Sequence, residues 1–116
     1  MRAQLPAGQS VWPAFWLLPA DGSAPPEIDI MEVIGDEPTK LWTTVHSNHT
    51  GERTTSTNQG DDVADTSVGF HTYSVNWTAE AITWYFDGDV HGNTATTEMT
   101  IVLMGLHNLT EGDFLI

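Results

Sequence analysis

The chain of 116 residues contains no cysteine, and its three Lys and Arg residues stand against sixteen Asp and Glu residues. Without cysteine, disulfides, thiolate metal sites and cysteine nucleophiles are excluded. The formal net charge of −13 opposes binding to nucleic-acid phosphates or to an anionic membrane surface, because either partner would repel the chain. No apolar run approaches the roughly 20 residues that a membrane-spanning helix needs. We therefore expect neither a nucleic-acid nor a membrane partner.

What the chain does contain indicates one all-β domain over residues 1–116. The hydrophobic fraction of 40%, with five Trp residues, is too high for a disordered acidic tail. Thr, Val, Ile and Trp form short runs separated by Gly and Pro, and no long stretch keeps a helical period. The predicted strands are Val11–Leu18, Glu27–Ile34, Leu41–Asn48, Phe70–Trp77, Ala81–Asp87 and Thr100–Met104, with a strand end at Arg2–Leu5.

Two stretches of the second half of the chain have distinct patterns. Residues 70–77 and 81–87 alternate apolar and polar side chains around a short connection, which predicts a β-hairpin with Trp77 and Trp84 in the core. Between Gly51 and Gly69 the chain is polar and has no period, so we expect a long surface loop there.

Three carboxylates interrupt the β-branched run Glu27-Ile28-Asp29-Ile30-Met31-Glu32. On a regular strand Glu27 and Asp29 share a face, whereas Glu32 points to the apolar face. One β-bulge near Ile30-Met31 absorbs the extra residue and returns Glu32 to the face of Glu27. The sequence therefore predicts a bulged strand with all three carboxylates on one side.

The spacing of these carboxylates suits glycoside hydrolysis. With the bulge, the Cα atoms of Glu27 and Glu32 lie roughly 13 Å apart, which leaves about 5 Å between their carboxyl groups, the separation used by retaining glycosidases. Asp29 between them would hydrogen-bond or repel its neighbours. Two other interpretations stay open, namely a solvated acidic strand face and a calcium site.

Aromatic and imidazole side chains near this segment are candidates for sugar binding. Trp12 and Trp16 share parity on their predicted strand, and indole faces stack on the C–H faces of sugars; the alternative is that both belong to the core. His46 shares parity with Trp42 and Thr44. If its strand lies beside the carboxylate strand, His46 faces the cleft and can bind a sugar hydroxyl.

The combined motifs resemble glycoside hydrolase family 16, in its bulged E-x-D-x-x-E branch of laminarinase-like endo-β-glucanases. The resemblance covers roughly residues 2–89 and is carried by Trp12-Pro13-Ala14-Phe15-Trp16-Leu17-Leu18-Pro19, Glu27-Ile28-Asp29-Ile30-Met31-Glu32, Val45-His46-Ser47 and Phe70-His71-Thr72-Tyr73. It implies a concanavalin A-like β-jelly-roll sandwich and a secreted, retaining endo-β-glycanase acting on a β-1,3- or mixed β-1,3/1,4-glucan. By position, Glu27 corresponds to the nucleophile, Asp29 to the assisting carboxylate and Glu32 to the general acid/base.

Competing functions follow from the same features. A carbohydrate-binding sandwich would keep the Trp residues and need no carboxylate geometry. The short chain, compared with the roughly 200–250 residues of many β-sandwiches, also suggests the central part of a larger domain, and an inactive fragment is the third possibility. No signal peptide is visible in residues 1–6. We expect a polysaccharide substrate, no required cofactor, no catalytic metal and a monomer; a structural calcium ion is not visible in the sequence.

Overall fold

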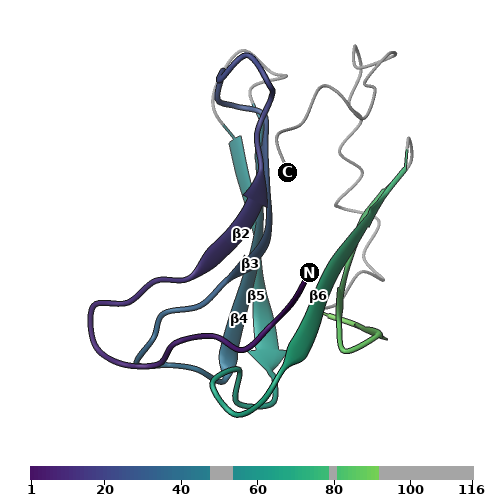
Figure 1. Ribbon diagram of the computed structural model, residues 1–116. Coiled ribbons are helices and arrows are strands. Elements are labelled where there is room, and N and C mark those ends of the chain that lie inside the picture. Colours follow the sequence, from purple (N-terminus) through teal and green to yellow (C-terminus); the bar gives the residue numbers. More distant parts are fainter. Residues whose placement is uncertain (48–53, 79–80, 92–116) are drawn as a thin grey trace.

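Two four-stranded antiparallel sheets make up the fold. The computed structural model of the chain describes residues 1–47, 54–78 and 81–91. The first sheet has the order β2 (Ala14–Leu17), β3 (Glu27–Glu32), β4 (Lys40–Ser47) and β5 (Thr54–Asp62); the second has the order β1 (Arg2–Ala3), β6 (His71–Trp77), β7 (Ile82–Phe86) and β8 (Asp89–Val90). Figure 1 shows them as two separate layers. The predicted all-β class is confirmed.

The core lies between the two sheets, because each of its clusters contains residues from both. One cluster joins Leu5, Ile30, Met31, Val33, Leu41 and Tyr73; the other joins Ile28, Val45, Ile82 and Trp84. Burying such side chains stabilises the fold by about 1.5–3 kcal/mol each. The opposite face of the first sheet is therefore free to carry polar groups. The described part of the chain contains no helix that is long and apolar enough to cross a membrane.

Most predicted strands are present with shifted ends. β2 begins at Ala14 rather than at Val11, because Pro13 has no N–H to donate to a strand ladder. β3 ends at Glu32, two residues earlier than predicted. The strand predicted at Thr100–Met104 lies outside the described residues.

The prediction of a loop throughout residues 51–69 is wrong, because this range contains β5 at Thr54–Asp62. The strand pairs with β4 from Lys40↔Asp62 to Ser47↔Thr54. This pairing joins backbone groups and needs no apolar alternation, so a search for buried faces does not detect it. The β-branched threonines of the segment were the available signal.

The predicted hairpin is confirmed by the pairing of β6 with β7 from Tyr73↔Phe86 to Trp77↔Ile82. Trp84 is buried, and Trp77 packs against the cluster that contains it, so both belong to the core as expected. The next connection, between β7 and β8, is a two-residue turn in which Asp87 has φ 51° and Gly88 has φ 92°. Positive φ at both positions matches a type I′ turn, which fits the twist of the strands.

Asp87 also joins this turn to β6 through His71. The Nδ1 atom of His71 lies 2.7 Å from Oδ2 of Asp87, and the backbone N–H of Thr72 donates to Oδ1. The hydrogen bond with Asp87 raises the pKa of His71, and the same bond lowers the pKa of Asp87. The pair therefore stabilises the fold when His71 is protonated and Asp87 is ionised.

We expect stability to fall as the pH rises above the ordinary histidine pKa of about 6.5, because the raised pKa of His71 contributes only while the ring keeps its proton. The lowered pKa of Asp87 contributes stability above the ordinary Asp pKa of about 3.9, and this contribution is lost as the pH falls below that value. Between about pH 5.5 and about pH 8.5 the free energy of unfolding should drop by about 1 kcal/mol more in the parent than in Asp87→Asn, a modest value because Asp87 is partly exposed. Urea titrations at the two pH values measure this; equal drops would exclude the effect.

Candidate active site

The carboxylates are arranged by the register of β3, the second strand of the first sheet. Asp29 pairs with Thr44, but Glu32 pairs with Trp42, so three steps along β3 match two along β4. The pairing with β2 shifts in the same region, where Phe15 faces Met31 and Trp16 faces Asp29. The extra residue at Ile30-Met31 is the predicted β-bulge, which is thereby confirmed.

Because residues paired directly across strands share a face, the register defines three rows on one side of the sheet. The first row contains Ala14, Glu32 and Trp42; the second contains Trp16, Asp29 and Thr44; the third contains Glu27 and His46. Figure 1 shows β2, β3 and β4 side by side in this sheet. The bulge thus places all three carboxylates together on the face turned away from Ile28 and Val45, which lie in the core.

Asp29 occupies the centre of the site and is only 3% exposed. Its Oδ2 lies 3.2 Å from Nε2 of His46, and its backbone carbonyl accepts a hydrogen bond of 3.0 Å from the indole of Trp84 in the opposite sheet. Buried carboxylates need such partners, because loss of hydration is costly. This burial argues against the interpretation of the segment as a solvated acidic face.

The two glutamates flank Asp29 and are partly exposed. Oε2 of Glu32 accepts a long hydrogen bond of 3.5 Å from the hydroxyl of Thr44. Glu27, Asp29 and His46 each offer an atom within 4.8 Å of the others. Such a group could hold a cation, but its atoms are the ones that carboxylate catalysis would use.

His46 therefore lies where the sequence predicts, beside the carboxylates on the neighbouring strand. Its contact with Asp29 adds a role in orienting that carboxylate. The predicted bond to a sugar hydroxyl stays a prediction.

Two tryptophans carry exposed indole surface, and the register places one of them, Trp16, on the carboxylate face. Trp12 is 66% exposed and Trp16 is 44% exposed. Their exposure excludes the alternative that they are core residues, and it leaves their predicted role in sugar stacking untested.

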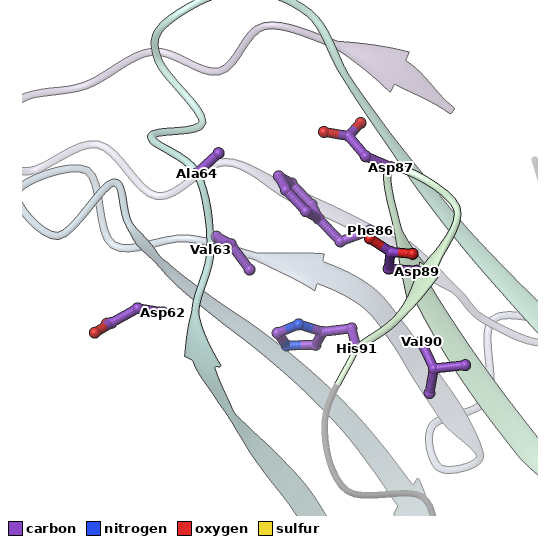
Figure 2. A pocket seen from close by; sticks show the side chains of 8 residues that line it. All are labelled: Asp62, Val63, Ala64, Phe86, Asp87, Asp89, Val90 and His91. Atoms are coloured by element: carbon purple, nitrogen blue, oxygen red, sulfur yellow. The ribbon is translucent and has the colours of Figure 1, made fainter.

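A separate pocket of about 340 Å³ lies between the end of β5 and the β7–β8 hairpin, as Figure 2 shows. Its lining residues are Asp62, Val63, Ala64, Phe86, Asp87, Asp89, Val90 and His91. Figure 2 shows Phe86 and His91 projecting from the hairpin toward Val63. The lining contains no predicted site residue, so the carboxylate face remains the candidate site.

Three side chains near the carboxylates were not predicted as part of the site. Thr44 contacts Glu32, Trp42 lies opposite Glu32, and Trp84 anchors the backbone of Asp29. For Thr44 and Trp42, the available signal was that both alternate in step with His46 along their strand and so share its face. Trp84 comes from the other sheet, and no sequence pattern indicates which backbone carbonyl its indole reaches.

Comparison with known proteins agrees with the geometry. The chain is 60% identical over 87 residues to the endo-1,3-1,4-beta-glycanase ExsH of Rhizobium meliloti, covering 75% of this chain and 18% of that protein. The laminarinase of Rhodothermus marinus superposes with a TM-score of 0.60 at 35% identity, covering 78% of this chain and 39% of that one. SCLam, a non-specific endo-beta-1,3(4)-glucanase, gives a TM-score of 0.62 at 38% identity, covering 78% of this chain and 34% of that one.

The chain thus spans well under half the length of these relatives. The sequence model of the family named glycosyl hydrolases family 16 matches residues 1–103 of the chain. The two antiparallel sheets are those of the β-jelly-roll enzymes of this family. With the bulged carboxylate strand at their centre, the chain belongs to glycosyl hydrolases family 16.

Proposed function

We propose that the chain hydrolyses internal β-glycosidic bonds of a β-1,3- or mixed β-1,3/1,4-glucan with retention of configuration. The observation that carries this proposal is the set of Glu27, Asp29 and Glu32 on one face of a bulged strand. The names of the relatives support the substrate class. A polysaccharide does not cross membranes, so we also propose that the protein acts outside the cell. We further propose that it acts as a monomer.

In the first half of the reaction Glu27 attacks the anomeric carbon. The carbon–oxygen bond to the leaving sugar breaks as Glu32 donates its proton to that oxygen, and a glycosyl ester forms on Glu27. Asp29, fixed by His46 and by the indole of Trp84, lies between the two reacting groups. Its buried position keeps the two glutamates in a fixed relation during the step.

In the second half water attacks the same carbon. Glu32, now ionised, takes a proton from the water, and the bond to Glu27 breaks. The two inversions together retain the β-configuration. Each group thus returns to its starting state.

Sugar release separates this enzyme from the carbohydrate-binding sandwich, which the exposed Trp12 and Trp16 would also suit. The test incubates the chain with laminarin, lichenan, agarose and a succinoglycan-type polymer, and measures new reducing ends; proton NMR identifies the first anomer. We expect β-anomers from a β-1,3-linked glucan in the parent and none in Glu27→Gln, whereas Glu37→Gln, at an exposed loop residue, serves as the matched control. Saturable binding without any release would instead establish the binding function.

The exposed indoles give a second expectation. Trp16 neighbours Asp29 in the register, so loss of its stacking surface should weaken substrate binding near the reacting bond. Stacking on an aromatic ring contributes about 1 kcal/mol, so we expect Trp16→Ala to raise KM by roughly fivefold with a smaller change in kcat. Initial rates over a range of laminarin concentrations measure this, and Val68→Ala, at an exposed apolar residue outside the site, is the control. An unchanged KM would remove Trp16 from the binding surface.

A further inference from the structure

The indole of Trp42 is a buried hydrogen-bond donor that the catalytic scheme leaves unused. Its Nε1 atom is buried and has no hydrogen-bond partner among the residues that the structure describes. Buried N–H groups almost always have an acceptor, and an unpaired one is destabilising. The position of Trp42 therefore calls for an acceptor close by.

Glu32 is directly opposite Trp42 in the pairing of β3 with β4. Side chains at such positions share a face, with Cβ atoms about 5 Å apart, so the indole and the carboxyl group can meet. Ala14, on the other side of Glu32, has no polar side chain to offer. On the other side of Trp42 the register places Gln59 of β5. An ionised carboxylate is a stronger acceptor than a neutral amide, so we assign the carboxyl group of Glu32, the proposed general acid/base, as the acceptor.

Glu32 has room for this second donor. The hydroxyl of Thr44 donates a long hydrogen bond of 3.5 Å to Oε2 of Glu32, and a carboxylate accepts about four hydrogen bonds.

We propose that Trp42 is a positioning residue for the general acid/base: its indole N–H donates a hydrogen bond to Glu32 and strengthens that bond as Glu32 loses its proton. This inference rests on the proposed function, because it assigns Glu32 the proton transfers. In the first step the O–H bond of Glu32 breaks, the proton moves to the leaving oxygen, and a carboxylate remains. That carboxylate is the state that an N–H donor stabilises most.

The kinetic test compares two leaving groups in Trp42→Phe, which keeps the aromatic surface and removes the N–H. A phenyl glycoside of a β-1,3-glucan oligosaccharide needs the proton of Glu32, whereas a 2,4-dinitrophenyl glycoside departs without it. We expect kcat/KM to fall roughly tenfold on the phenyl substrate and less than about twofold on the dinitrophenyl substrate. Trp42→His, which restores a ring N–H, should recover part of the loss.

An equal fall on both substrates would show a merely structural role and overturn the proposal. A parent chain that releases no sugar from either substrate would instead contradict the proposed function. These two failures are therefore distinguishable. The hydrogen bond between Trp42 and Glu32 can also be tested without any substrate.

Nitrogen-15 NMR follows the indole N–H of Trp42 directly, since the chain has five Trp residues and Trp42→Phe identifies the missing signal. We expect the chemical shift of this signal to differ between the parent and Glu32→Gln, which replaces the carboxyl group that accepts the indole N–H, and to stay the same in the control Glu37→Gln. An unchanged signal in Glu32→Gln would overturn the proposal.

Discussion

Replacing Glu27 or Glu32 by alanine is expected to lower kcat/KM on glucan by at least about 10²–10⁴-fold, the usual contribution of a positioned acid/base group. The two losses should differ in kind. A dinitrophenyl glycoside departs without a proton, so glycosylation in Glu32→Ala should be far less impaired on it, whereas Glu27→Ala should remain slow on every substrate because the ester cannot form.

Azide distinguishes the two roles by stereochemistry. In Glu32→Ala the glycosyl ester on Glu27 still forms, and azide attacks it without needing a base, which gives a β-glycosyl azide. In Glu27→Ala azide occupies the space of the lost carboxylate and attacks directly, which gives the α-product. Proton NMR of the isolated products decides between them, and Glu37→Ala should behave as the parent. If Glu32→Ala gave the α-azide and Glu27→Ala gave the β-azide, the roles given to Glu27 and Glu32 would have to be exchanged.

The bulge of β3 shows how far physical reasoning from the sequence reaches. Glu32 had to leave the apolar face, because a charged side chain in the core is unfavourable, and an inserted residue is the simplest way to achieve this. The pairing of Glu32 with Trp42 confirms this argument. Alternation likewise predicted the β6–β7 hairpin, because one face of each strand is buried.

Where an element is not specified by burial, the sequence was less informative. β5 is polar and was predicted as a loop, since its place in the sheet follows from backbone pairing with β4. The sequence also does not indicate that Trp84 is a partner of Asp29. Its contact with Trp84 joins residues 55 positions apart in different sheets, and such a contact depends on how the layers pack.

Trp84 connects the stability of the fold to the geometry of the site. It is 1% exposed, packs with Ile28, Val45 and Ile82, and donates its indole N–H to the carbonyl of Asp29. Trp84→Ala is expected to lower the free energy of unfolding by about 3–5 kcal/mol, through lost burial and the cavity that remains. An effect of this size is a large fraction of the stability of a typical domain.

Trp84→Phe separates the two contributions, because it keeps most of the apolar surface and leaves the carbonyl of Asp29 without its donor. We expect a loss of about 1–3 kcal/mol together with a lower kcat, since the backbone that carries Asp29 is no longer anchored. Ile82→Val, in the same cluster, is the matched control: it should cost about 0.5–1.5 kcal/mol and leave kcat unchanged. Urea unfolding followed by circular dichroism gives the stabilities, and initial rates at saturating glucan give kcat. If Trp84→Phe destabilised the fold no more than Ile82→Val and kept full kcat, the bond from Trp84 to Asp29 would have no part in holding the catalytic strand.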